Sequence, residues 1–250
     1  MNTLILAFQL MTRIPIPKAV DVTTQRLCRG VLFWPLIGLV TGAIDALVFA
    51  GASWLFSFPV GVMAALFCQL CVTGGFHLDG LCDTADAIYS SRSRQRMLEI
   101  MKDSRIGTNG VIAAIFDIGL KFLCVCQAKN PVLVLVLAPV AGKCVQGILM
   151  YKAIYPRTSG LGMSYIGKIS QWIMVGCALG GLGIMAVAGI ISGLLWVVPL
   201  AVFVMAAAIL YRKYIERKIG GMTGDTLGAG SELMEIVFML GILAVQRRIL

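Results

Sequence analysis

Charged residues are scarce in this chain. Lys, Arg, Asp and Glu make up 13% of its 250 residues, whereas hydrophobic residues make up 59%. A soluble domain carries roughly one quarter charged residues, because it needs them to cover its surface. The scarcity therefore excludes an ordinary soluble fold. It favours an all-α protein that crosses the lipid bilayer several times.

Signatures of several other protein classes are also missing. The CxxC spacing of Cys68 and Cys71 has no second pair and lies in an apolar run, so the cysteines are better explained as small apolar filler than as a zinc or redox site. Residues 4–11 are too short for a signal peptide and lead into RIPIP at residues 13–17, which is not a small-residue cleavage site. The net charge of +9 comes from basic residues in loops between apolar runs. The positive-inside rule explains that distribution without a nucleic-acid partner.

Six apolar segments are long enough, or nearly so, to cross a bilayer, and a seventh span is possible. Basic clusters separate them into three hairpins, which puts the N-terminus and the main loops on the cytoplasmic side. Residues 4–11 are expected to form a short interfacial helix, and residues 236–245 a partly inserted or re-entrant helix. We expect residues 1–250 to form a single integral membrane domain. The predicted spans are residues 30–50, 60–73, 111–127, 132–150, 172–191 and 194–210, with a turn at residues 51–59.

Three aspartates stand immediately after one apolar run. Asp79, Asp83 and Asp86 follow one another in steps of four and three, which puts their carboxylates on one face of a helix. Like charges at this spacing repel unless a cation compensates them, as Mg²⁺ does with oxygen ligands and substrate phosphates. A solvated helix face is the simpler explanation. It is less favoured, because the triplet adjoins a span and the only histidine, His77. The pattern predicts metal-dependent phosphate chemistry at a membrane surface.

The loop after these aspartates carries further charged candidates. A short surface helix is predicted over residues 93–101. Lys102 and Arg105 can bind phosphate, Asp103 can be a further metal ligand, and nearby glycines let the backbone approach a ligand. The alternative is a helix N-terminal cap with ordinary flanking charges. The loop alone does not decide between them.

Two later segments add candidates for phosphate or nucleotide binding. Arg157, in the segment of residues 155–162, offers a planar fork suited to a diphosphate. Residues 220–232 are rich in glycine, which predicts a flexible loop with N–H donors for an anion or nucleotide. Asp225 and Glu232 would add oxygen ligands there.

Three charged residues stand out inside predicted spans, namely Asp45 and the pair of Asp117 and Lys121. Asp117 and Lys121 are four residues apart, so they are expected to neutralise each other. A proton relay, as in a transporter, is the less favoured explanation.

Taken in order, these motifs resemble those of the adenosylcobinamide-GDP ribazoletransferases, also called cobalamin 5′-phosphate synthases. The resemblance covers nearly the full length. Lys143 stands where relatives usually carry Arg, which keeps the charge but loses the bidentate contact. The matching segments are FQLMTRIPIP at residues 8–17, Arg29 and Gly30 with Pro35, Gly38 and Gly42, GGFHLDGLCDTADA at residues 74–87, MLEIMKDSRIG at residues 97–107, Tyr155 and Arg157 with Gly160 to Gly162, and GMTGDTLGA at residues 221–229.

The resemblance implies a multi-pass transferase of the bacterial or archaeal cytoplasmic (inner) membrane, with one or two Mg²⁺ ions and an active site facing the cytoplasm. In this family, adenosylcobinamide-GDP donates its cobinamide-phosphoryl group to the 3′-hydroxyl of α-ribazole or α-ribazole 5′-phosphate. GMP leaves, and adenosylcobalamin or its 5′-phosphate forms. The sequence is compatible with a homo-oligomer and does not decide the oligomeric state.

This hypothesis gives each candidate residue a role. Asp83 or Asp86 would accept the proton of the 3′-hydroxyl. His77 is a further catalytic candidate, as a general base, a phosphate contact or a packed supporting residue, and the supporting role is favoured. The rival function is an ion-coupled membrane transporter, which predicts ionisable residues along the membrane midplane. The grouping of most acids at span ends and in loops favours the enzyme. The predicted metal ligands are Asp79, Asp83, Asp86 and Asp103, and the predicted substrate- or phosphate-binding residues are Lys102, Arg105, Arg157, Lys143, Gly221, Thr223, Gly224, Asp225 and Glu232.

Overall fold

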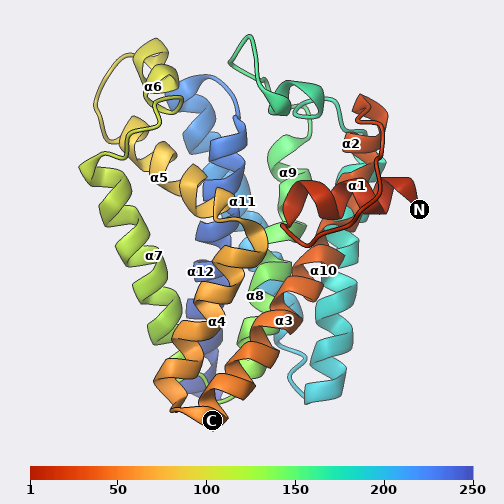
Figure 1. Ribbon diagram of the computed structural model, residues 1–250, viewed down its shortest axis with the longest axis vertical. Helices are drawn as coiled ribbons and strands as arrows, with labels where there is room; N and C mark the ends of the chain where they lie inside the picture. The colour runs from red at the N-terminus through yellow and green to blue at the C-terminus, as the bar shows by residue number, and fades with distance from the viewer. Residues whose placement is uncertain (250) are drawn as a thin grey trace.

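The computed structural model describes residues 1–249, and across that range the chain is helical without strands (Figure 1). Two 3-10 turns, η1 (Val31–Phe33) and η2 (Leu161–Ser164), interrupt the α-helices. The helices are α1 (Asn2–Met11), α2 (Thr24–Gly30), α3 (Trp34–Leu55), α4 (Phe58–Thr73), α5 (Phe76–Ile88), α6 (Arg94–Ile100), α7 (Thr108–Gln127), α8 (Pro131–Cys144), α9 (Gln146–Met150), α10 (Gln171–Ser192), α11 (Val197–Ile219) and α12 (Gly224–Ile249).

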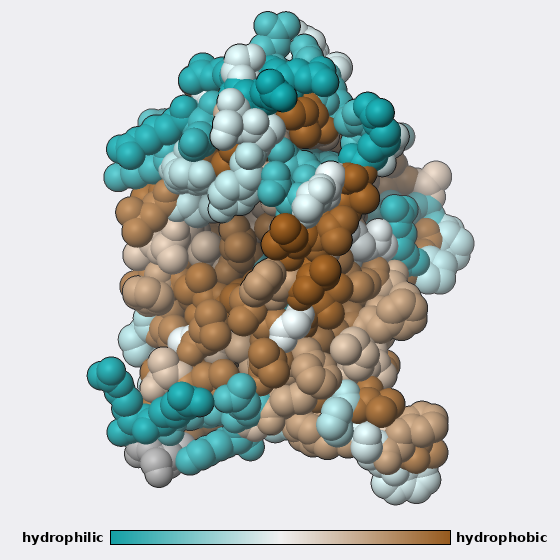
Figure 2. Space-filling model, turned by 90° about the vertical axis from the view of Figure 1, so that its left-hand side faces the viewer, coloured by the Kyte–Doolittle hydropathy of each residue, from teal (hydrophilic) through white to brown (hydrophobic). Residues whose placement is uncertain are grey.

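Six helical segments of the described chain are long and apolar enough to cross a membrane, which confirms the predicted polytopic bundle. Helices α4 and α5 form a bent pair, which makes a seventh span if the two are counted together. In Figure 2 a broad apolar belt separates hydrophilic surfaces at the two ends of the molecule. The six segments are Thr24–Leu55, Thr108–Gln127, Pro131–Met150, Gln171–Ser192, Val197–Ile219 and Gly224–Arg248.

The prediction was wrong in the last part of the chain. Residues 236–245 are not a short re-entrant helix, because they belong to α12, which has 26 residues. The glycine-rich segment 220–232, predicted as a flexible loop, is helical from Gly224 onward. Close helix packing, described next, explains why these glycines do not form a loop.

The turn predicted at residues 51–59 is shorter than expected. It is confined to residues 56 and 57 between α3 and α4.

Glycines set the closest contact between α3 and α8. A Cβ atom on Gly38 would lie 2.6 Å from the carbonyl oxygen of Pro139, and one on Gly42 would lie 2.6 Å from that of Val136. The two glycines are four residues apart, so they face α8 together. The spacing lets two membrane helices approach backbone to backbone.

The same kind of contact joins α5 to α12. A Cβ atom on Gly80 would lie 2.7 Å from the carbonyl oxygen of Asp225, and one on Gly228 would lie 3.1 Å from the Cα atom of His77. One glycine comes from each helix. The glycines near the start of α12 therefore bring α12 onto the aspartate-bearing helix.

A glycine pair turns the chain between α4 and α5. Gly74 and Gly75 have φ angles of 71° and 67°, in the left-handed region that glycine adopts without steric cost. The two helices meet at 90°. The amide of Arg13 donates to the carbonyl of Val72 at 2.7 Å, which ties the N-terminal segment to this corner. The corner directs α5 toward α6 at one end of the bundle (Figure 1).

Candidate active site

Helix α5 presents two of its aspartates to a pocket at the end of the bundle that carries α6. Asp79 is exposed and Asp83 is half-buried. The loop after α6 supplies the opposite wall with Lys102 and Asp103. The structure thus brings together four residues that the sequence singled out. This aspartate pocket has a volume of about 340 Å³ and is lined by Asp79, Cys82, Asp83, Met101, Lys102, Asp103, Ser104 and Ile106.

Asp86, the third aspartate of α5, has backbone partners. Its carboxylate accepts hydrogen bonds from the amides of Gly107 at 2.7 Å and Gly110 at 2.8 Å. These amides belong to the first turn of α7, where a negative charge is favourable. Asp86 does not line the aspartate pocket. These hydrogen bonds fix the start of α7, and the metal and proton-transfer roles of Asp86 stay predictions.

Asp103 forms an ion pair with Arg105 at the rim of the pocket. The Nε and Nη2 atoms of Arg105 donate to the two carboxylate oxygens of Asp103 at 3.0 and 2.6 Å. These hydrogen bonds and one from the Arg105 amide lower the pKa of Asp103 to about 2. The Arg105 side chain is 86% exposed, and it does not line the pocket.

A second ion pair lies beside the pocket, between Arg157 and Asp225. The Nη2 atom of Arg157 lies 2.6 Å from the Oδ2 atom of Asp225. Asp83 is within electrostatic range of both residues and of Asp79. The Nε atom of Arg157 is buried and has no hydrogen-bond partner among the residues that the structure describes. The guanidinium group therefore has unused capacity to donate at the site.

The segment that carries Arg157 packs on the start of α12. The amide of Met222 donates to the carbonyl of Ile154 at 2.8 Å, and the Tyr155 hydroxyl donates to the carbonyl of Ser159 at 3.0 Å. Tyr165 in the same segment is buried, which raises its pKa to about 12. These contacts hold Arg157 against Asp225.

Three other predicted phosphate-binding residues stand where α12 begins. Thr223 and Thr226 exchange hydrogen bonds between their hydroxyls and amides at 2.8 and 3.2 Å, as in a helix N-terminal cap. Gly221 packs against the carbonyl of Ile154, where a side chain would collide. Gly224 is exposed at the first position of the helix. The structure explains Gly221 and Thr223 by local geometry, without a ligand.

Glu232 and Lys143 were predicted at the phosphate site, but they lie inside the bundle. Glu232 is buried and pairs with Lys121. Lys143 is buried too, and its Nζ atom donates to the Ser231 hydroxyl at 2.9 Å. Neither residue lines the aspartate pocket. The reason is that α12 continues as a helix and carries Glu232 away from the polar end.

The predicted pairing of Asp117 with Lys121 is confirmed, at 3.3 Å. The sequence analysis missed that two more acids converge on this lysine, because Glu232 also pairs with it and Glu235 lies 3.2 Å away. The spacing of three between Glu232 and Glu235 was the available signal. It required recognising α12 as a span.

His77 is buried and lies outside the aspartate pocket. Its ring centroid lies 3.9 Å from that of Phe76, and its backbone packs against Gly228. Of the roles that the sequence left open, the packed supporting residue fits this position best.

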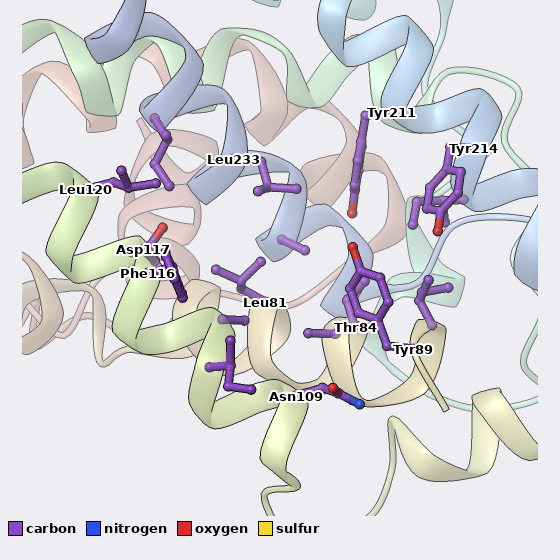
Figure 3. Close-up of a pocket in the computed structure, with 17 residues that line it drawn as sticks. Leu81, Thr84, Tyr89, Asn109, Phe116, Asp117, Leu120, Tyr211, Tyr214 and Leu233 are labelled. Carbon is purple, nitrogen blue, oxygen red and sulfur yellow. The ribbon is translucent and has the colours of Figure 1, made fainter. Parts of the chain in front are cut away.

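A larger cavity of about 660 Å³ lies on the opposite face of α5, between α7, α11 and α12 (Figure 3). Its walls are largely apolar. Asp117 lies toward one end, and Tyr89, Tyr211 and Tyr214 lie toward the other. The smaller aspartate pocket combines carboxylates with a lysine, which are the groups that the predicted phosphate chemistry requires.

The aspartate pocket fits a magnesium ion that arrives with a phosphate ligand. Within residues 1–249, no three His, Cys, Asp or Glu side chains are grouped so as to hold a metal ion by themselves. Mg²⁺ commonly takes one or two carboxylates and completes its shell with water and substrate phosphates. Asp79 and Asp83, one turn apart at the same pocket, match that requirement.

Comparison with known proteins points to one family. The sequence model of the cobalamin-5-phosphate synthase family matches residues 3–243. The adenosylcobinamide-GDP ribazoletransferase of Clostridium novyi (strain NT) is 40% identical over 247 residues, which cover 98% of this chain and 97% of the relative. The enzyme of the same name from Listeria welshimeri is 39% identical, and the alignment covers 98% of this chain and 98% of the relative. The one from Escherichia coli O17:K52:H18 is 40% identical, and the alignment covers 93% of this chain and 96% of the relative. No solved structure matches the chain significantly.

Proposed function

Because the chain belongs to the cobalamin-5-phosphate synthase family, we propose that it transfers the cobinamide-phosphoryl group of adenosylcobinamide-GDP to the 3′-hydroxyl of α-ribazole or α-ribazole 5′-phosphate. The reaction depends on Mg²⁺ and releases GMP. Adenosylcobalamin or its 5′-phosphate is the product, as in a late step of cobalamin synthesis.

The arrangement around the aspartate pocket supports this proposal. Asp79, Asp83 and Asp103 offer oxygen ligands, and Lys102 lies on the same walls. Arg157 stands beside them with an unused buried donor. A diphosphate with its metal needs both kinds of group, anionic for the cation and cationic for the phosphates.

Each residue at the pocket has a stated task. Asp79 and Asp83 hold Mg²⁺, with Asp103 at the rim; when bound, the metal neutralises the diphosphate and stabilises the charge that develops on the leaving GMP. Asp83 accepts the proton of the attacking hydroxyl. Asp86 is the weaker candidate for that step, because both of its carboxylate oxygens already accept from backbone amides. Lys102 and Arg157 bind phosphate oxygens.

We place the enzyme in the bacterial cytoplasmic membrane with the aspartate pocket facing the cytoplasm. The basic segments before α2, around α6 and between α9 and α10 lie at the same end of the bundle as the pocket (Figure 1). An excess of Lys and Arg marks the cytoplasmic side of membrane proteins.

The test is an assay of the full chain in lipid nanodiscs with adenosylcobinamide-GDP, α-ribazole 5′-phosphate and Mg²⁺, in which GMP and the corrinoid product are separated by chromatography. The unaltered chain should release both products, and EDTA should abolish the release. Asp79→Asn and Asp83→Asn should each lower turnover about 100-fold or more. Asp21→Asn is the matched control, because it removes the same charge from an exposed side chain outside the pocket. Near-normal turnover of both pocket variants at saturating Mg²⁺ would remove the metal assignment.

The buried charges around Lys121 are the feature that a transporter would also show. Here they are close to one another, with Lys121 in contact with three carboxylates. Family membership favours the enzyme. Substrate flux into sealed vesicles without chemical conversion would reverse that choice.

A further inference from the structure

Both arginines predicted to bind phosphate hold an aspartate. Arg105 pairs with Asp103, and Arg157 pairs with Asp225, each at 2.6 Å. The pairs differ in exposure, because the Arg105 side chain is 86% exposed and that of Arg157 only 10%. Water screens the first pair, so it opens at little cost. The second pair is the one that can control access to the site.

Arg157 is only partly satisfied by Asp225. Its Nη2 atom donates to the carboxylate, but its buried Nε atom has no hydrogen-bond partner within residues 1–249. A buried donor without an acceptor costs free energy. Its planar fork matches two oxygens of a carboxylate or phosphate. The unused Nε atom therefore indicates that an anion completes the hydrogen bonds of this guanidinium group.

Asp225 competes with a metal-free anion for Arg157. An anion that takes Arg157 from Asp225 leaves this carboxylate without its ion-pair partner, within electrostatic range of Asp79 and Asp83. Three unpaired carboxylates at one site repel each other. A diphosphate that carries a divalent cation avoids this cost, because the cation compensates the aspartates while the phosphate binds the arginine.

We propose that Asp225 determines specificity by occupying Arg157, so that the site rejects metal-free phosphate anions and accepts a diphosphate only together with its metal. This inference rests on the proposed function, because it assumes that Arg157 binds the diphosphate. It assigns Asp225 a role in selecting the ligand that is separate from holding the nucleotide or a second metal.

The experiment measures GDP binding to the full chain in nanodiscs by equilibrium dialysis, with EDTA and with Mg²⁺ at controlled free concentration. With EDTA, Asp225→Asn should bind GDP about tenfold more tightly than the unaltered chain, because Arg157 is released. With Mg²⁺ this advantage should disappear. Thermal unfolding of each variant shows that it is folded.

Asp79→Asn is the matched control. It removes the same charge from the same site, but Asp79 does not pair with Arg157. Its gain in metal-free GDP affinity should be clearly smaller than that of Asp225→Asn. Equal gains would overturn the proposal, because they would show a general charge effect. An unchanged or weaker metal-free affinity of Asp225→Asn would overturn it as well.

Arg157→Gln separates this inference from the proposed function. The gain from Asp225→Asn should vanish when Arg157→Gln is also present. If Arg157→Gln weakens GDP binding with Mg²⁺ but Asp225→Asn brings no metal-free gain, only the selection by Asp225 is wrong. If Arg157→Gln leaves GDP binding unchanged under both conditions, the selection fails together with the assignment of phosphate to Arg157. The turnover assay still decides the reaction itself.

Discussion

Two groups of carboxylates in this protein have opposite surroundings. The pocket group consists of Asp79, Asp83, Asp103 and Asp225, and the interior group consists of Asp117, Glu232 and Glu235. Each acid of the interior group is in ion-pair contact with Lys121. In the pocket group, Asp79 and Asp83 form no ion pair within the described residues, and the other two hold arginines.

This difference in ion-pair partners indicates a structural role for the interior group and a binding role for the pocket group. The interior acids share Lys121, and Glu235 also lies 3.9 Å from the Nζ atom of Lys143, so these contacts hold α7 and α8 to α12. Within the pocket group, Asp79 and Asp83 have no such partners among the described residues, so they retain mutual repulsion, which a bound cation relieves. Carboxylates in an apolar chain are thus informative only once their partners are known. Substitutions at the two groups should have different effects on stability and activity.

Lys121→Met should have the largest effect on stability. It leaves the interior acids without their shared partner, and breaking a buried ion pair costs about 3–5 kcal/mol. The thermal unfolding temperature in nanodiscs should fall sharply, or the variant should fail to assemble. A variant with unchanged unfolding would contradict the structural role of the interior group. Lys129→Met is the control, since Lys129 is exposed between α7 and α8.

Asp83→Asn should show the reverse behaviour. Turnover should fall about 100-fold or more, equivalent to about 2.7 kcal/mol in the activation free energy. The unfolding temperature should stay the same or rise in the absence of metal, because a repelling charge has been removed. A large loss of stability would show instead that Asp83 belongs with the structural carboxylates.

Gly80→Ala should affect both properties moderately. The added methyl group would collide with the carbonyl of Asp225, so α5 and α12 must move apart. Overpacking of this kind costs about 1–3 kcal/mol, and turnover should fall because the aspartates on the two helices separate. Gly119→Ala in α7 is the matched control, since within residues 1–249 the added Cβ would meet no atom within 4 Å beyond the neighbouring backbone of its own helix. If both variants behave alike, the close contact has no role at the site.

Arg105→Ala should have the smallest effect, and this effect should be lost at low pH. Arg105 holds the pKa of Asp103 at about 2, below its ordinary 3.8. Because the folded-state pKa is lowered, the pair stabilises the fold above about pH 4, and this contribution is lost as the pH falls toward 2. The difference in unfolding temperature between the unaltered chain and Arg105→Ala should be constant from pH 7 to about pH 4 and shrink below it. If the difference in unfolding temperature grew as the pH falls, the ion pair would not stabilise the fold in the way that the lowered pKa of Asp103 predicts.

Local patterns predicted the local structure well. The spacing of Asp79, Asp83 and Asp86 predicted α5, and Ser93 begins the predicted surface helix by accepting from the amide of Arg96. Long apolar runs likewise predicted most of the spans, because the length needed to cross a bilayer can be counted in the sequence.

Such local patterns could not predict contacts between residues that are distant in the sequence. Glu232 resembled a loop ligand because the lysine that pairs with it comes from α7, 111 residues earlier. Arg157 and Asp225 are 68 residues apart, so no local sequence spacing predicts their contact. The glycines of α12 were misinterpreted for the same reason, since the helix against which they pack is distant in sequence.

Asp86 links the position of α5 to that of α7. By holding the amides of Gly107 and Gly110, it fastens α5 to the first turn of α7. At a rise of 1.5 Å per residue, Lys121 lies roughly 20 Å further along α7. Helix α7 thus connects the Asp86 contacts on α5 to the buried charges around Lys121, and we expect a tilt of α5 at the polar end to change the ion-pair distances in the interior of the bundle.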